Sequence, residues 1–325
     1  MKKIVLTIAI LCLAIVSVFA FGSKEKEAAT EMPKTAVMGS GGMGGTSHAT
    51  FSMIATQIQK YTDVTVTNQA SGGSSENARL IKQGEYEFGM MNTAMIVYAL
   101  NGTADFKADG PYKDIRFVAN LYPSAAQAVV RKSSNIQSFA DLKGKVFSPG
   151  PAGSGDVTGF EEIVGFYGLT TKDMDWRPLT NTERVSAFKD RILDCGGWLT
   201  SFPAGNILEL STATPIRLLS IADKDDEFFK KFPYYVKMVI PKETYNGMDA
   251  DVIVPGVGII VASRADVNAE LVYTFLKGMY MGLDELQTVH SMATYIKLET
   301  ALDGSKGVPI HDGAIKYFKE KGVLK

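Results

Sequence analysis

Three times along the chain, a short apolar run ends in a turn rich in glycine and serine, and a helical pattern then begins. The turns are residues 39–45, 71–75 and 149–156. Glycine lets the backbone approach a ligand closely, and the first amides of a helix have no intrahelical partner. In a parallel α/β sheet, such turns lie beyond the carboxyl ends of the strands, where ligands bind. The repetition therefore predicts an α/β fold in which three helix starts hold one or two carboxylates in a shared cleft.

The first turn also matches a dinucleotide-binding pattern, because Gly39, Gly41 and Gly44 have the spacing G-x-G-x-x-G. That interpretation needs an acidic residue at the end of the second strand to hold a ribose hydroxyl. The second strand ends in Asn68 and Gln69 instead. The sequence therefore disfavours a nucleotide, and no cofactor is expected. Each turn could also serve only to cap its helix, but doubled glycines recurring in this context favour a binding site.

The first residues have the pattern of an export signal. Two lysines precede an apolar stretch over residues 4–19, which is short for a membrane span and ends at small residues. We expect residues 1–20 to be a cleavable signal peptide and the polar residues 21–34 to be a flexible leader, which predicts a periplasmic protein. The alternatives are an uncleaved anchor and a lipid on Cys12.

Removing residues 1–20 leaves 305 residues (325 minus 20) with a net charge of −3 (32 basic minus 35 acidic). This mild charge gives no reason to expect DNA, RNA or an anionic membrane surface as a partner. The histidines, at positions 48, 290 and 311, have no metal-binding spacing, and no G-x-S-x-G motif occurs. We expect neither an enzyme nor a metal site. The alternatives are an exported α/β enzyme that uses His48 or Cys195 and a sensor-partner binding protein of similar fold.

Two long apolar runs, residues 128–131 and 258–262, bracket a segment with its own alternation of strands and helices. This pattern predicts that the chain leaves one α/β lobe, builds a second and returns. Lobe I would comprise residues 35–128 and 258–325, and lobe II residues 129–257. The cleft between two such lobes is a natural site for a small ligand. Prolines at positions 123 and 255 are expected to interrupt the strands around them.

Several stretches resemble the TAXI-type solute receptors of tripartite ATP-independent periplasmic (TRAP) transporters, in the order found in that family. They are GSGGMGGTSH, QASGGSSENARLIKQGEYEFG, DLKGKVFSPGPAGSG, IPKETYNGMDADV and VPIHDGAIKYFKEKG. The resemblance implies a two-lobed, type II-like periplasmic binding protein with mixed sheets flanked by helices. Such a receptor closes on a small carboxylate or amino acid, such as glutamate or 2-oxoglutarate, and delivers it to the transporter's membrane subunits. We expect it to be a monomer.

The resemblance also implies which residues contact the solute. Carried over by position, they are Gly42, Gly45, Thr46, Ser47, His48, Gly73, Ser74, Asn92, Thr93, Ser154, Gly155 and Asp156. Trp198 is added because its ring could stack on a ligand. The chain departs from the family at Ala94 and near Ser124, where acidic residues are usual, and at Gly196 and Gly197, where bulky aromatics are usual. These departures bear on which solute is bound.

Overall fold

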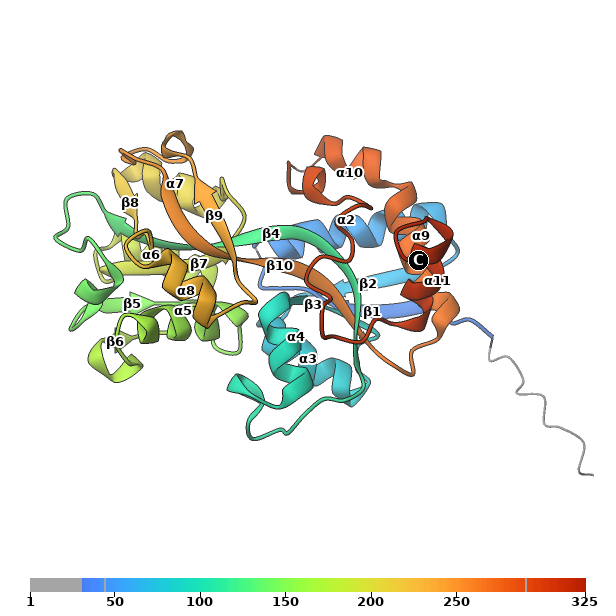
Figure 1. Ribbon diagram of the computed structural model, residues 1–325. Helices are drawn as coiled ribbons and strands as arrows, with labels where there is room; N and C mark the ends of the chain where they lie inside the picture. The colour runs from blue at the N-terminus through green and yellow to red at the C-terminus, as the bar shows by residue number, and fades with distance from the viewer. Residues whose placement is uncertain (1–30, 44, 290) are drawn as a thin grey trace, which may run out of the picture. The chain divides into compact units, whose positions relative to one another are not determined.

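Two long antiparallel strands, β4 (Ile115–Arg131) and β10 (Val252–Arg264), form the centre of a ten-stranded sheet (Figure 1). Their residues are buried almost throughout, as is typical of strands covered on both faces. The two strands pair with each other along the half of β4 that begins at Ile115. Beyond that shared stretch, both strands continue into a second group of elements, where β4 pairs with β7 and β8 and β10 pairs with β9.

The computed structural model describes residues 31–43, 45–289 and 291–325. The predicted signal peptide, most of the predicted leader, Gly44 and His290 lie outside the described residues. Within the described part of the chain, no helix combines the length and the apolar character needed to cross a membrane.

One group of elements, here called lobe I, is joined to the amino-terminal half of β4 and the carboxyl-terminal half of β10. β1 pairs in parallel with both β2 and β3, and β3 pairs antiparallel with β10. Its strands are β1 (Thr35–Gly39), β2 (Thr65–Gln69) and β3 (Phe88–Asn92). Its helices are α2 (Thr46–Tyr61), α3 (Ser74–Gln83), α4 (Thr93–Asn101), α9 (Ala269–Met281), α10 (Leu283–Val289) and α11 (Asp312–Glu320).

The second group, here called lobe II, surrounds the other ends of the two long strands. β5 pairs in parallel with β6 and β7, β7 and β8 pair antiparallel with β4, and β9 pairs antiparallel with β10. Its strands are β5 (Val146–Ser148), β6 (Asp175–Trp176), β7 (Cys195–Thr200), β8 (Ile216–Leu218) and β9 (Val236–Ile240). Its helices are α5 (Gly155–Phe166), α6 (Asn181–Lys189), α7 (Gly205–Ala213) and α8 (Asp225–Lys231).

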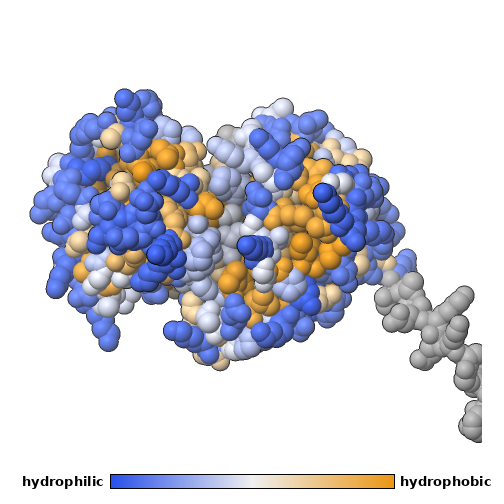
Figure 2. Space-filling model, viewed as in Figure 1, coloured by the Kyte–Doolittle hydropathy of each residue, from blue (hydrophilic) through white to orange (hydrophobic). Residues whose placement is uncertain are grey.

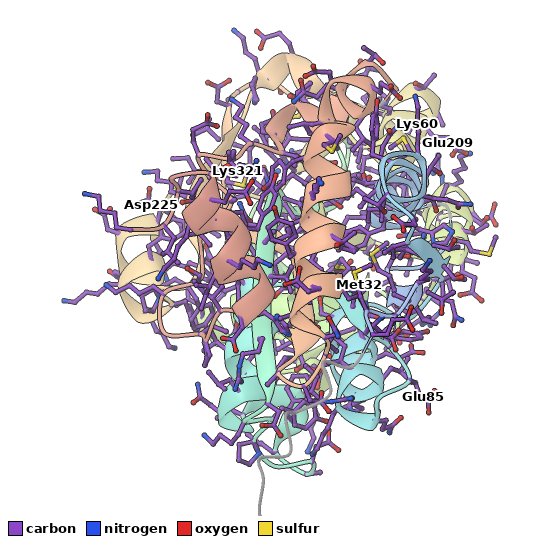
Figure 3. The ribbon with its side chains drawn as sticks, turned by 90° about the vertical axis from the view of Figure 1, so that its right-hand side faces the viewer. Met32, Lys60, Glu85, Glu209, Asp225 and Lys321 are labelled. Carbon is purple, nitrogen blue, oxygen red and sulfur yellow. The ribbon has the colours of Figure 1, made fainter. Side chains whose placement is uncertain are left out.

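The helices cover the sheet with their apolar stripes. On α2, the apolar stripe of Phe51, Ile54, Ala55 and Ile58 is buried, and the helix packs against α9, which also packs against α11 (Figure 3). Most of the surface seen in Figure 2 is hydrophilic, although apolar residues gather on part of lobe I. Charged side chains such as Glu85 project outward (Figure 3).

The predicted α/β fold, with a mixed sheet flanked by helices, is confirmed. The predicted lobe boundaries, at residues 128/129 and 257/258, fall inside β4 and β10 and stay a prediction. The expected interruptions at Pro123 and Pro255 are wrong, because both strands continue through the prolines. Proline is tolerated in a strand near bulges and at edges. The β4–β10 pairing shifts register between Ile259 and Ile260, one pair away from Pro123, and Pro255 pairs with β9.

Candidate ligand-binding site

The first glycine-rich turn directs the start of α2 into a cavity. Helix α2 begins at Thr46, and its N-cap residue is Gly45, which has no side chain to bond the first amides. These N–H groups are therefore available to a ligand. The hydroxyl groups of Thr46 and Ser47 lie at the same helix end. Ser47 Oγ accepts a hydrogen bond from Tyr122 at 3.1 Å, which holds this residue in place.

Helices α3 and α5 begin in the same way. Neither N-cap residue, Gly73 or Ser154, caps its helix, and the Ser154 hydroxyl donates to the Pro151 carbonyl at 2.7 Å instead. Gly73 has a φ of +112°, a conformation that favours glycine. Gly155 allows the third turn to approach lobe I closely, because a Cβ there would lie 2.4 Å from Asn92 Nδ2. Both glycines therefore have a geometric role at the site.

Two further helix starts that the sequence analysis missed reach the same cavity. Asn181 is the first residue of α6, and Gly205 and Asn206 are the first residues of α7. The α7 N-cap, Ala204, forms no side-chain cap, whereas Thr180 caps α6. Neither helix follows a turn rich in glycine and serine, so the pattern that marked the first three turns could not predict them. Four uncapped helix starts, those of α2, α3, α5 and α7, thus meet at one place.

The cavity has a volume of about 140 Å³, close to the size that holds a molecule such as benzene. It is lined from both lobes, and most of its polar groups are backbone amides and hydroxyls. The predicted residues in its lining are Gly42, Gly45, Thr46, Ser47, Gly73, Ser74, Asn92, Ser154, Gly155, Asp156 and Trp198. Lining residues beyond the prediction include Met90, Asn181, Thr200, Asn206 and Ile259.

The structure places two predicted residues outside this lining. His48 Nδ1 lies 2.9 Å from Ser40 Oγ and 3.4 Å from the side-chain nitrogen of Asn68, so local side chains hold its ring. Thr93 Oγ1 accepts a hydrogen bond from the Gly258 amide at 3.2 Å. Thr93 lines a separate cavity of about 330 Å³ instead. Both residues are adjacent in sequence to residues that line the cavity, but their side chains contact groups outside the lining.

The chemistry of the described residues gives little support to the enzyme alternative. Cys195 is fully buried in β7, and burial raises the pKa of its thiol well above the ordinary value. A thiol of this kind is a poor nucleophile. Among the residues that the structure describes, no three His, Cys, Asp or Glu side chains are grouped so that they could hold a metal ion.

Asp156 and Arg184 form the charged part of the site. Arg184 is fully buried, its guanidinium stacks on the Trp198 ring at 4.5 Å, and its Nη1 lies 3.8 Å from Asp156 Oδ2. Burial raises the pKa of Asp156 to about 6, although the Arg184 charge opposes that shift. Burial also lowers the pKa of Arg184 to about 10, against the effect of Asp156. The pair therefore places a partly desolvated carboxylate at the cavity wall.

Gly196 and Gly197 create room for the aromatic groups behind this wall. A Cβ at Gly196 would lie 2.6 Å from the Trp198 ring, and a Cβ at Gly197 would lie 2.5 Å from the Phe160 ring. A larger residue at Gly196 would displace Trp198, which carries the stacked guanidinium, and a larger residue at Gly197 would displace the Phe160 ring. Gly196 therefore determines how the tryptophan contributes to the cavity.

Comparisons with known proteins agree with this architecture. The sequence matches the NMT1-like family over residues 38–322. Among solved structures, the chain is similar to the alkanesulfonate-binding protein from Xanthomonas axonopodis pv. citri bound to MOPS, at 14% identity and a TM-score of 0.50, covering 89% of this chain and 84% of that one. It is also similar to a putative L-cystine ABC transporter protein from Listeria monocytogenes, at 13% identity and a TM-score of 0.52, covering 82% and 99%. A structure described as a periplasmic transporter has 14% identity and a TM-score of 0.53, covering 89% and 93%. At these identities the likeness concerns the fold.

Proposed function

Because the chain belongs to the NMT1-like family, we propose that it is a periplasmic solute receptor. It binds a small carboxylate or amino acid between its two lobes and delivers it to membrane subunits of a transporter. It performs no chemistry on the solute. The fold shared with a periplasmic transporter protein and with an alkanesulfonate-binding protein supports this proposal.

The observation that carries the proposal is the convergence of four uncapped helix starts on one cavity. Each start presents unpaired N–H groups and the positive end of a helix dipole. Together they can bind an acid group without a basic side chain in the cavity wall. An apolar ligand would leave these amides without hydrogen-bond acceptors, which would disfavour its binding.

Contacts between the lobes support a mechanism of closure around the solute. The hydroxyl groups of Thr46 in lobe I and Thr200 in lobe II lie 3.4 Å apart at the cavity. Nearby, Asp105 of lobe I accepts hydrogen bonds from Ser75 of the same lobe and from Thr158 of lobe II, the latter at 2.7 Å. A solute that contacts both lobes would stabilise this arrangement over an open one.

A ligand screen tests the proposal. We expect small carboxylates or amino acids at 100 times their Kd to raise the unfolding free energy by about 2.7 kcal/mol, which corresponds to a rise of several degrees in Tm. The measurement is thermal unfolding with a panel of organic acids, amino acids, sulfonates and neutral apolar compounds. Stabilisation by neutral apolar compounds alone would contradict the proposal.

The proposed membrane partner is a TRAP transporter, on the resemblance of the glycine-rich turns to TAXI-type receptors. An ABC transporter is the second candidate, because similar folds include a putative L-cystine ABC transporter protein. The two candidates use different energy sources. Uptake into vesicles that contain the membrane subunits would require an ion gradient in the first case and ATP in the second.

A further inference from the structure

Among the described residues that line the cavity, Asp156 is the one with a charged side chain. It lies in the first turn of α5, and its side chain is 22% exposed. All other polar lining groups are amides, hydroxyls and the indole of Trp198. An acid group bound at the helix starts would therefore share a small cavity with a carboxylate.

The Asp156 carboxylate has unused capacity to accept hydrogen bonds. The backbone N–H of Leu199 lies near it and opposes the rise of its pKa. Arg184, at 3.8 Å, is too far for a hydrogen bond and donates instead to the Gly197 carbonyl and Asn181 Oδ1. A carboxylate has about four lone-pair sites. Arg184 therefore moderates the charge of Asp156 without filling its oxygens.

Trp198 supplies a second group without a partner. Its side chain is 2% exposed and lines the cavity, and its indole N–H has no hydrogen-bond acceptor within the described part of the chain. A buried indole N–H normally has an acceptor, and leaving it unpaired carries an energetic cost. Trp198 thus places an unmatched donor in the buried wall of the cavity, and Asp156 places an acceptor with free capacity beside it.

We propose that Asp156 is the residue that determines specificity, by binding a cationic nitrogen of the solute while the solute's acid group lies on the uncapped helix starts. The inference rests on the proposed receptor function and narrows the class of solute to zwitterionic amino acids. These should bind more tightly than the corresponding 2-oxo acids and than dicarboxylic acids. A solute with only negative groups would place like charges close together in a partly desolvated space, which disfavours binding. A zwitterion matches both signs of the cavity.

Matched ligand pairs test this assignment. L-Glutamate with 2-oxoglutarate and L-alanine with pyruvate each differ in the amino group at one carbon. By isothermal titration calorimetry at pH 7.5, we expect the affinity for the best-binding amino acid to be at least about tenfold higher than the affinity for its 2-oxo partner. In Asp156→Asn, which keeps the shape of the side chain, that preference should disappear through weaker amino-acid binding. Glu161→Gln removes a charge from the same helix outside the lining and should keep the preference.

The outcomes separate this inference from the proposed function. Tight binding of 2-oxo acids or dicarboxylic acids with an unchanged preference in Asp156→Asn would overturn the role of Asp156 and leave the receptor function intact. Failure of every acid and amino acid to bind would overturn both. Residual binding of the 2-oxo acid by Asp156→Asn shows that the variant is folded. As a second readout, amino-acid affinity of the unmodified protein should fall about tenfold between pH 7 and pH 5, and that of Asp156→Asn should not.

Discussion

The burial of Asp156 makes stability depend on pH in a predictable direction. Burial raises the pKa of this carboxyl from 3.8 to about 6 in the folded protein. A group with a raised pKa stabilises the fold below its unfolded pKa, and this stabilisation is lost as the pH rises through the folded pKa. Without ligand, the unfolding free energy should therefore fall by roughly 3 kcal/mol between about pH 3 and pH 7 relative to Asp156→Asn. Urea unfolding of both proteins at several pH values measures this, and a pH-independent difference would contradict it.

Gly155 allows a closer approach between the lobes than any other residue type would. A Cβ at this position would lie 2.4 Å from Asn92 Nδ2, so Gly155→Ala must displace either the Asn92 side chain, which lines the cavity, or the third turn. We expect the affinity for the solute to fall at least about tenfold, because misplaced contacts weaken several interactions at once. Calorimetric titration with the best ligand measures the effect.

The control for this substitution is on the same helix. A Cβ at Gly165 would meet no atom within 4 Å, so Gly165→Ala should leave the affinity unchanged. It should also raise the unfolding free energy by about 0.5–1 kcal/mol, since alanine loses less backbone entropy in a helix. Equal losses of affinity in both variants would show that the close approach at Gly155 is not the cause.

At the scale of the elements, α6 differs from the other helices at the cavity because its start is capped. Thr180 and Glu183 form a capping box. Thr180→Ala should lower the unfolding free energy by about 1 kcal/mol. Thr182→Ala, at the exposed neighbouring position, should have little effect. Denaturant titration compares the two variants, and similar values for both would mean that the cap contributes little to the fold.

The turns could be predicted from local sequence, whereas the packing behind them could not. A turn rich in glycine and serine before a helical pattern indicates an exposed helix start, so the turns before α2, α3 and α5 could be predicted from the sequence. The stacking of Arg184 on Trp198 joins two elements and depends on space left by Gly196. Likewise, β4 continues through Pro123 because its partner strand permits it. Such relations follow from tertiary packing, which no local pattern records.

At the scale of the whole molecule, closure should be adjustable from outside the cavity. The Tyr98 hydroxyl, on α4 of lobe I, hydrogen-bonds to Glu162 and Tyr234 of lobe II. Tyr235 also donates to Glu162, at 2.9 Å. None of these four residues lines the cavity. Their hydrogen bonds therefore favour the arrangement in which the lobes touch, whichever solute is bound.

Tyr98→Phe removes the hydroxyl that joins the lobes and keeps the ring. The loss of a hydrogen bond that contributes about 1 kcal/mol should lower the affinity for every ligand by about fivefold, mainly through faster dissociation. Tyr167→Phe is the matched control, because its hydroxyl donates to Asp223 within lobe II, at 2.7 Å. Stopped-flow measurements with an amino acid and its 2-oxo acid distinguish a direct contact with the solute from an effect on lobe closure. A change in the preference between the ligands would place Tyr98 at the solute, whereas a uniform loss is what a shift in the closure equilibrium requires.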